Sequence, residues 1–481
     1  MATVEALQAE VADLRRQVAE LQATVKALLA ENAALRAENT VLKAEVASLK
    51  GRLGMDSSNS SKPPSTDSPF KRPPPQPSTG KRPGAQRGHK GRYRRQAATA
   101  DVMETVAPCA CAHCGEALGA GDVTGRPFVR EIVDIEVKHH VRHIELLAAK
   151  CPKCRKKTRA QAPAGTPTGA FGPQVQATVG LMTMQGISRG DAQKLLKSMF
   201  DLDMSIGSID KACTDVERSV DAAVEQVAKH IGDAAVAHAD ETGWHVRGKL
   251  GWLWSALAKG AEYFRFDPKR DRDALRALVG EFSGLLHSDR WGPYKLFAPE
   301  MRQLCHAHLR RDIQALIDAD GADTAVGKRL LELSNEMFAL WHAFERKEID
   351  AAALENQMVP VKSGWEAAAR TLAQRPQGKG RALGRSLLAL WPALWNFVEY
   401  ELVQPTNNEQ EQGLRKAVKI RKNSFGSTSE AGAKRMAALL TVLGTARRQG
   451  VHLLRWLADA LDRRTRGLAP PLLLPVGAGA A

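Results

Sequence analysis

Three acidic residues stand where separate segments of the chain could bring carboxylates together. Asp240 ends the apolar run AAVAHAD and Asp289 ends the apolar run SGLLHSD, and both runs read as short strands. Glu411 lies in the acidic start of a helix predicted from PTNNEQEQGLRKAVKIRKN. Such carboxylates can bind two Mg²⁺ ions about 3.5–4 Å apart, which activate water for attack on a phosphodiester. Acidic residues at strand ends are more often simply solvated, so the pattern alone leaves both interpretations open.

The sequence also predicts where the helix that carries Glu411 begins. Thr406 can cap it, and Glu409, three residues further on, can complete a capping box. Glu411 then has no structural task of its own, which makes it the better candidate for chemistry. The aspartates lie at predicted carboxyl ends of strands, where α/β sheets place functional groups.

Four cysteines form two pairs, Cys111-Ala-His-Cys114 and Cys151-Pro-Lys-Cys154. Two such turns can give one Zn²⁺ a closed set of four thiolates, so we expect a structural zinc site. The alternating segment 128–150 predicts two strands in a zinc-ribbon-like module, and its many Lys and Arg residues suit DNA. Buried free cysteines are the simpler alternative.

A third group is the sequence CHAH, which contains Cys305 and His308. The two residues could be metal ligands or a catalytic pair, but no third partner stands at a suitable spacing. A structural role is therefore favoured, with Arg310 and Arg311 available to DNA phosphates. Past Glu411, several cations would position a DNA backbone without reading its sequence: Arg415, Lys416, Lys419, Arg421 and Lys422.

The elements that must position these residues can be predicted in outline. Strands are expected at 252–258 and 262–267, and a helix at 271–282. The region 313–394 is rich in Ala, Leu and Glu and reads as a helical insertion between Asp289 and Glu411. Helices are expected again at 436–464, followed by a loose tail.

The first fifty residues repeat in sevens. Seven leucines, from Leu7 to Leu49, occupy one heptad position, and valine or asparagine lies three residues before each. Valine and leucine at these positions favour a parallel two-stranded coiled coil, in which Asn32 and Asn39 would fix the register. The alternative is one amphipathic helix packed on its own chain, but two apolar positions in seven make a narrow stripe for that.

Two further segments connect the coiled coil to the acidic residues. Residues 53–105 are basic and rich in proline, which predicts an extended linker that follows phosphates or serves only as a spacer. Residues 190–231 read as a helix, a short turn and a long helix that Ser205 or Ser208 could cap. Either a DNA-binding helix-turn-helix or an ordinary helical hairpin fits.

Composition narrows the class of protein. The chain has 481 residues and a net charge of +16, and its hydrophobic fraction of 43% excludes a wholly disordered protein. No apolar run approaches the roughly 20 residues that a membrane-spanning helix needs. The basic charge indicates a polyanionic partner, with nucleic acid as the first candidate and an anionic membrane surface as the second. The paired cysteines suit a metal site in a reducing, cytosolic compartment.

Taken together, the chain resembles the insertion-sequence-66 family of bacterial transposases. The similarity lies in NSSKPPSTD, QRGHKG, the two C-x-x-C pairs, HADET, SDRWGPY, QLCHAHLRRD, PTNNEQEQGLR and RKNSFGSTSEAGAKR. It implies a DDE catalytic domain of ribonuclease-H-like fold with Asp240, Asp289 and Glu411 as the acidic triad. Two departures stand out: Gln412 replaces an arginine that is usual in the family, and His306 replaces a tryptophan.

The resemblance implies a multidomain α/β protein. The expected parts are a dimeric coiled coil (1–52), a basic linker (53–105), a zinc-binding module (106–160), a helical DNA-binding segment (161–232), a catalytic domain (233–312 and 395–465), the helical insertion (313–394) and a tail (466–481).

The implied activity is cleavage of DNA at the ends of a mobile element and joining of the 3′-hydroxyl ends to target DNA. Its cofactors would be two catalytic Mg²⁺ ions, with Mn²⁺ as a substitute, and one structural Zn²⁺. The partners would be the element's inverted repeats, the target DNA and a second copy of the chain, without a membrane. Small accessory proteins of the same element are further candidates, and the expected location is the cytoplasm at the nucleoid. The alternative is a non-catalytic, dimeric, zinc-containing DNA-binding protein derived from an inactive transposase, or a repressor.

Overall fold

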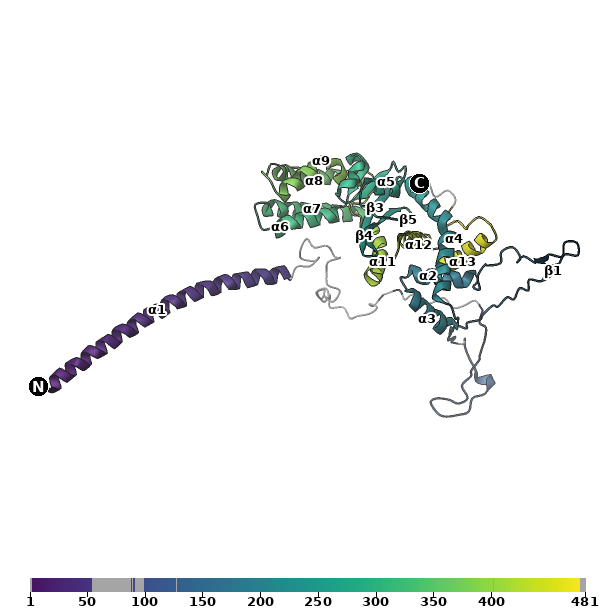
Figure 1. Cartoon of the computed structure of the whole chain (residues 1–481), viewed down its shortest axis with the longest axis horizontal. Coiled ribbons are helices and arrows are strands. Elements are labelled where there is room, and N and C mark those ends of the chain that lie inside the picture. Colours follow the sequence, from purple (N-terminus) through teal and green to yellow (C-terminus); the bar gives the residue numbers. More distant parts are fainter. Residues whose placement is uncertain are drawn as a thin grey trace. The chain divides into compact units, whose positions relative to one another are not determined.

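The structure is a computed structural model that describes residues 2–53, 88, 90, 99–126, 128–400 and 402–475. The chain divides into two compact units, one of residues 70–162 and one of residues 1–69 and 163–481. Most of the predicted linker, 53–105, lies outside the described residues. Helix α1 (Ala2–Leu53) is continuous, as Figure 1 shows in purple. Its described heptad valines and leucines, from Val11 to Val46, are exposed in the single chain, for example Leu21 at 64%.

The unit of residues 70–162 has little regular structure. A two-stranded antiparallel sheet joins β1 (Ala148–Lys150) to β2 (Lys157–Arg159), and these strands frame the second cysteine pair. A short 3-10 turn covers Ala120–Asp122. The two strands predicted across 128–150 are wrong in part, because only β1 forms at the end of that segment and no strand covers 128–147 among the described residues. Ile132 and Ile135 are 80% and 85% exposed, so the alternation has no apolar layer to face, which a strand needs for stability.

A five-stranded mixed sheet organises the other unit. Its order is β5-β4-β3-β6-β7. The strands are β3 (Val236–Val246), β4 (Lys249–Ala258), β5 (Ala261–Asp267), β6 (Leu285–Ser288) and β7 (Arg302–Leu304). The first three pair antiparallel, whereas β6 runs parallel to β3 and to β7. The strands that the sequence predicted at 252–258 and 262–267 are therefore confirmed.

Strand β3 is longer than the sequence suggested. Asp240 is the fifth of its eleven residues, so its predicted place at the end of a strand is wrong. The reason is that β3 has different partners on its two sides. Its pairing with β6 ends at His238, whereas its pairing with β4 continues to Val246. Asp240 nevertheless lies just beyond the last residue that pairs with the parallel half of the sheet.

Helices cover the sheet and its edge strand. The long helix α4 (Ile206–Gly232) packs its apolar side, including Val220 and Val227, into the main core with β3–β6. Helix α12 (Glu430–Arg448) lies along β5, where Thr445 Oγ1 accepts a hydrogen bond from Glu262 N at 3.1 Å and Thr441 Oγ1 accepts one from Phe264 N at 2.9 Å. These threonines accept hydrogen bonds from backbone N–H groups that would otherwise be unpaired on an edge strand.

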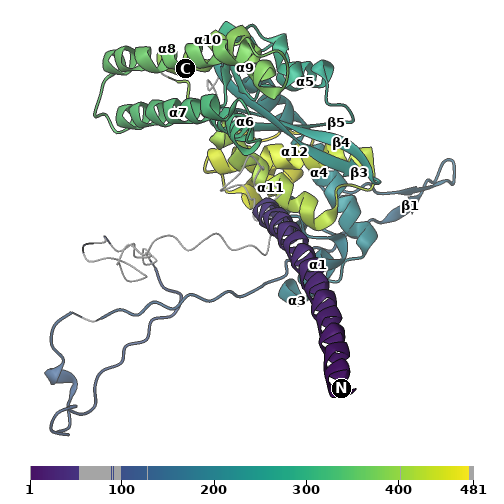
Figure 2. The ribbon, with the colours of Figure 1, turned by 90° about the vertical axis from the view of Figure 1, so that its left-hand side faces the viewer.

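Helices form across 313–394, where the sequence predicted them. These helices are α6 (His306–Asp318), α7 (Thr324–Glu345), α8 (Ala351–Ala373), α9 (Lys379–Ala389) and α10 (Trp391–Glu399), which surround a core of their own. Helices α7 and α8 lie side by side (Figures 1 and 2). This core includes Leu285 and Leu304 of the sheet, so the insertion is fastened to strands β6 and β7.

The remaining helices complete the same unit. Helices α2 (Pro173–Met184) and α3 (Arg189–Phe200) pack against the start of α4, and Ser205 caps α4 as predicted by accepting a hydrogen bond from Ser208 N. Helix α5 (Arg272–Val279) follows β5, and α13 (Leu453–Thr465) follows α12. The predicted loose tail is wrong in part, because Leu473 and Leu474 are buried in the main core. Among the described residues, no helix combines the length and apolarity that crossing a membrane requires.

Candidate functional site

The three acidic residues singled out in the sequence lie on or beside the middle strands of the sheet, close enough for their charges to interact. Asp240 projects from β3, and Asp289 follows directly on the last residue of β6. Glu411 lies in the first turn of α11 (Asn408–Ser424). Because side chains alternate along a strand, Asp240 shares its face of the sheet with His238 and Trp244, and Trp244 packs against α11.

The pKa of Asp240 depends on the charges of the neighbouring carboxylates. Burial raises the pKa of Asp240 well above its usual value, and the negative charges of Glu241, Asp289 and Glu411 raise it further. A hydrogen bond from the backbone N–H of Glu241, at 2.9 Å, opposes this rise. The three triad carboxylates do not collapse into one tight group, since their oxygens do not all lie within 4.8 Å of one another. Like charges held apart in a buried setting are what a divalent cation would stabilise.

The start of α11 differs from the prediction. Asn407, rather than Thr406, is the N-cap residue, and no side chain caps the helix. Glu409 forms an ion pair with Arg448 of α12 at 2.5 Å instead of completing a capping box. The predicted capping box is therefore wrong, because the side chain of Glu409 is engaged by Arg448 instead.

Asn407 is fully engaged with the sheet. Its Nδ2 donates a hydrogen bond to the carbonyl oxygen of Ala239 at 3.2 Å, and its Oδ1 lies 2.8 Å from His238 Nδ1. This pairing requires the proton of His238 to be on Nδ1. Burial lowers the pKa of His238, which keeps the ring neutral. Since the carbonyl oxygen of Asn407 accepts a hydrogen bond from Glu411 N at 3.1 Å, one residue connects β3 to the helix turn of Glu411.

Glu241 joins the two aspartate segments on the opposite face of the sheet. Its side chain is buried and accepts hydrogen bonds from Tyr294 Oη at 2.6 Å and Arg270 Nε at 2.8 Å. The Arg270 guanidinium lies 3.8 Å from the ring centre of Trp291. Trp291 in turn donates its backbone N–H to Asp289 Oδ1 at 2.8 Å. No role was predicted for Glu241 from the sequence, although its place beside Asp240 was a usable indication.

Asp289 has a second support in the buried Arg302 of β7. Arg302 Nη2 donates a hydrogen bond to the carbonyl oxygen of Asp289 at 2.9 Å. Burial lowers the pKa of Arg302 to about 10, while the carboxylate of Asp289 opposes that shift. The neighbouring Arg290 forms an ion pair with Asp312 of α6 at 2.7 Å. These contacts fix the turn after β6, and sequence reasoning missed Arg302.

Cys305 and His308 of the CHAH segment have a third potential metal ligand nearby, which the local sequence did not predict. Cys305, His308 and Glu411 place one potential ligand atom each within 4.8 Å of the others, in a group that is unique among the described residues. Burial raises the pKa of the Cys305 thiol to about 11. Burial also lowers the pKa of His308, and nearby Arg311 lowers it further, whereas Glu411 opposes the change.

His306, which departs from the usual tryptophan, lies in the core of the insertion. Its Nε2 donates a hydrogen bond to the carbonyl oxygen of Leu394 at 2.9 Å. Aromatic rings surround it, among them Trp365 and Phe397. Burial lowers the pKa of His306 to about 4, so the ring is neutral and structural.

A cationic pocket lies between α11 and α12. Its volume is about 550 Å³, and its basic lining residues are Arg415, Lys416, Lys419, Arg447 and Arg448. It contains Arg415 and Lys419, which the sequence suggested for DNA, and Gln412 also lines it. Lys422 is exposed further along the same helix. Arg310 is instead bound to α7, where it donates hydrogen bonds to Ser334 and Asn335.

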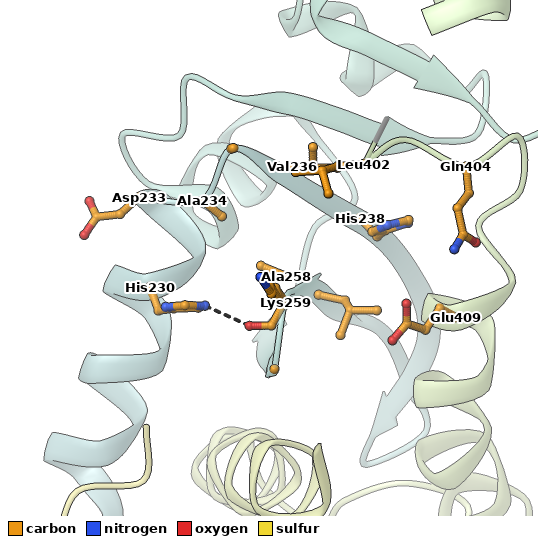
Figure 3. Close-up of a pocket in the computed structure, with 13 residues that line it drawn as sticks. His230, Asp233, Ala234, Val236, His238, Ala258, Lys259, Leu402, Gln404 and Glu409 are labelled. Carbon is orange, nitrogen blue, oxygen red and sulfur yellow. Dashed lines mark hydrogen bonds between the residues drawn. The ribbon is translucent and has the colours of Figure 1, made fainter. Parts of the chain in front are cut away.

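A second cavity, of about 360 Å³, lies between α4, β3 and the segment before α11. Figure 3 shows His230 on one wall and Glu409 on the opposite wall, with His238 nearby. His230 Nε2 donates a hydrogen bond to the carbonyl oxygen of Lys259 at 3.1 Å. His238, which contacts Asn407, is thus one of the residues that line this cavity.

The two C-x-x-C pairs form similar turns in the other unit. The backbone N–H of Cys111 donates to Glu116, and that of Cys151 donates to Lys156, both through hydrogen bonds of under 3 Å. Hydrogen bonds from local backbone N–H groups, His113 first, lower the pKa of Cys111, and those around Cys151 do the same there. Each turn favours thiolates, as a zinc ligand requires. The structure does not bring the two pairs into one group of ligands, and the zinc module stays a prediction.

An acidic cluster on a mixed sheet, with helices between its second and third members, defines a mixed α/β domain. Comparison with known sequences places the chain more closely. The profile described as Transposase IS66 family matches residues 183–435, which is more than half of the chain. The protein therefore belongs to the IS66 family of transposases, as the resemblance indicated. Residues 7–95 match a family of unknown function, DUF6444.

Relatives occur in Sinorhizobium fredii (strain NBRC 101917 / NGR234). The chain is 27% identical to Uncharacterized protein y4qI over an alignment of 240 residues that covers 45% of this chain and 44% of the relative. It is 23% identical to Uncharacterized protein y4hP over 366 residues, 68% of this chain and 66% of the relative. The chain thus spans less than half of the first relative's length and just under two thirds of the second's.

Proposed function

We propose that this protein is a DNA transposase of the DDE type, with Asp240, Asp289 and Glu411 as its acidic triad. The observation that carries the proposal is the placement of Asp240 on β3, of Asp289 directly after β6 and of Glu411 in the first turn of α11. They lie close enough for the charges of Asp289 and Glu411 to add to the rise in the pKa of Asp240 that burial and Glu241 cause. The sheet order β5-β4-β3-β6-β7 supports a ribonuclease-H-like catalytic domain. Membership of the transposase family supports the same assignment.

The residues present fit a pair of Mg²⁺ ions, or Mn²⁺ in their place. All three triad groups are carboxylates, and Oε1 of Glu411 is buried without a hydrogen-bond partner in the structure. Oxygen ligands are those that Mg²⁺ prefers. When bound, the ions would activate water and neutralise the charge that develops on the phosphate.

The chain's own residues would hold the reacting DNA and the carboxylates in place. Asn407 connects Glu411 to β3. The backbone N–H of Trp291 and the side chain of Arg302 both donate hydrogen bonds to Asp289. In hydrolysis, a water oxygen bonds to phosphorus, the bond between phosphorus and the 3′ oxygen breaks, and that oxygen leaves as a 3′ hydroxyl. In strand transfer, this hydroxyl attacks a target phosphate and displaces the 3′ oxygen of the target strand.

The partners in this proposal are DNA and a second copy of the chain. The cationic pocket of α11 and α12 would contact the phosphate backbone. The exposed heptad side chains of α1 would pair two protomers, so that both ends of an element are cut in one complex. The C-x-x-C module would hold one structural zinc ion per chain, and metal analysis tests this expectation. The activity implies a cytoplasmic, nucleoid-associated protein.

The test uses a DNA duplex that carries the sequence flanking this gene, where inverted repeats are expected. With Mg²⁺, the wild-type chain should cut it to 3′-hydroxyl ends, and Asp240→Asn should reduce cutting to background. Asp273→Asn is the matched control, because that aspartate is 85% exposed on α5. Cleavage that survives Asp240→Asn refutes the proposed mechanism. Binding of the duplex by a wild-type chain that never cuts it would favour the non-catalytic alternative, for which Gln412 is the sequence argument.

A further inference from the structure

The starts of two helices, α6 and α11, lie close together and bring three different ligand types into one group. Cys305 and His308 lie at the start of α6, and Glu411 lies in the first turn of α11. Each offers one atom, and the three atoms lie within 4.8 Å of one another. The set consists of a sulfur, an imidazole nitrogen and a carboxylate oxygen, so it differs in kind from the oxygen-only triad.

The distance between His308 and Glu411 suits two ligands of one metal ion better than a hydrogen bond between them. His308 Nδ1 lies 3.7 Å from Glu411 Oε1, which is too long for a hydrogen bond. Two ligands at zinc bond lengths in a tetrahedral site lie about 3.3 Å apart. Both atoms are buried and have no hydrogen-bond partner in the structure. A buried unpartnered polar atom needs an explanation, of which a missing ion is one.

The backbone around the sulfur is already organised. Asn407 N donates a hydrogen bond to Cys305 Sγ at 3.2 Å. Cys305 N donates to the carbonyl oxygen of Ser288 at 2.9 Å, which ties the cysteine to the end of β6. The ligands therefore sit on fixed elements. The side chains of His308 and Glu411 are also 26% and 35% exposed, which leaves an entry path from solvent.

We propose that Cys305, His308 and Glu411 bind a divalent cation of the zinc type, with one coordination position left open. Thiolate and imidazole ligands select zinc-like ions over Mg²⁺, which takes oxygen ligands. Binding would release the thiol proton to solvent, because the thiolate is the ligand. Only one consequence rests on the proposed transposase function: Glu411 is shared with the Mg²⁺ set, so a zinc-type ion in this site would inhibit Mg²⁺-dependent cleavage.

The test follows Co²⁺, a spectroscopic substitute for zinc, on the full chain without DNA after removal of bound metal. Wild type should bind one more Co²⁺ per chain than Cys305→Ala. The difference spectrum should contain a sulfur-to-cobalt charge-transfer band. The cysteine pairs of the other unit contribute equally to both samples and cancel. Zn²⁺ should remove the band, whereas Mg²⁺ should leave it.

Matched variants distinguish the loss of a metal ligand from unfolding of the chain. His308→Ala and Glu411→Gln keep the thiol and should each weaken Co²⁺ binding at this site by about tenfold or more. Cys213→Ala, which removes a buried cysteine of α4 far from these ligands in the chain, should bind like wild type. Circular dichroism checks that each variant is folded.

Equal Co²⁺ stoichiometry in wild type and folded Cys305→Ala would overturn the proposal, as would displacement of the band by Mg²⁺. Because the measurement needs no DNA, its outcome is separate from that of the cleavage test. A chain that binds Co²⁺ through Cys305 but never cuts DNA would refute only the proposed function. One that cuts DNA without this band would refute only the metal site.

Discussion

The side-chain amide of Asn407 donates a hydrogen bond to the carbonyl oxygen of Ala239, the residue directly before Asp240. The contact spans 168 residues of sequence and joins the helix of Glu411 to the strand of Asp240. It therefore sets the relative position of two proposed metal ligands.

Asn407→Ala should impair cleavage more than it impairs folding. Loss of the buried amide leaves the Ala239 carbonyl and the His238 ring unpaired, which should reduce the free energy of unfolding by about 1–3 kcal/mol. Cleavage of the flanking-DNA duplex should fall by about tenfold or more, because small displacements of catalytic ligands are costly. The matched control is Asn408→Ala, which truncates an exposed asparagine one residue away. Equal cleavage by the two variants would show that Asn407 does not position Glu411.

The sequence predicts well those features that local patterns determine. Asp289 follows a short apolar strand as expected, because the apolar run is bounded by Ser283 and Gly284 before it and by Asp289 after it. The helices of the insertion are likewise visible in their apolar periodicity. Such patterns extend over a few turns or residues, and the structure retains them.

Features that depend on distant partners could not be predicted in this way. The position of Asp240 within β3 depends on two neighbouring strands of different length. The cap expected at Thr406 is displaced because Asn407 is held by β3. Glu411 is the missing third partner of Cys305 and His308, and more than a hundred residues separate them. None of these relationships has a local pattern.

The buried His306 should make stability depend on pH in a defined window. Its pKa is about 4 in the folded chain against 6.5 when free. The unfolded chain therefore binds a proton between these values while the folded chain does not, so the contribution of His306 is complete above pH 6.5 and is lost as pH falls toward 4. The loss amounts to about 3 kcal/mol.

Urea unfolding between these pH values checks this expectation. His306→Gln keeps a donor for the Leu394 carbonyl but cannot titrate, so its stability should fall less than that of wild type as pH is lowered. His342→Gln removes a histidine whose side chain is 56% exposed, and it should retain the wild-type dependence. Parallel curves for wild type and His306→Gln would contradict the assignment of His306 as a buried neutral ring.

The cationic pocket predicts how DNA binding responds to salt. Arg415 and Lys419 are exposed at its rim. If each contacts one phosphate, replacing both by alanine should weaken binding of any duplex sequence and lower the slope of log K against log salt by about 0.9 per lost contact. Fluorescence anisotropy over a range of salt concentrations measures both effects. Lys328→Ala, on the exposed side of α7, is the control, and an unchanged slope in the double variant would place the DNA elsewhere.

The heptad residues of α1 predict self-association of the whole chain. Leu28 is 57% exposed in the single chain, although its spacing suits the interior of a two-stranded coil. Leu28→Asp would bring two carboxylates together in a desolvated seam and should weaken the dimer by several kcal/mol. Ala27→Asp adds the same charge one residue away, on the outer side of the predicted coil, and should leave the dimer intact. Sedimentation equilibrium distinguishes the two variants, and a wild-type chain that remains monomeric at high concentration would show that α1 has another partner.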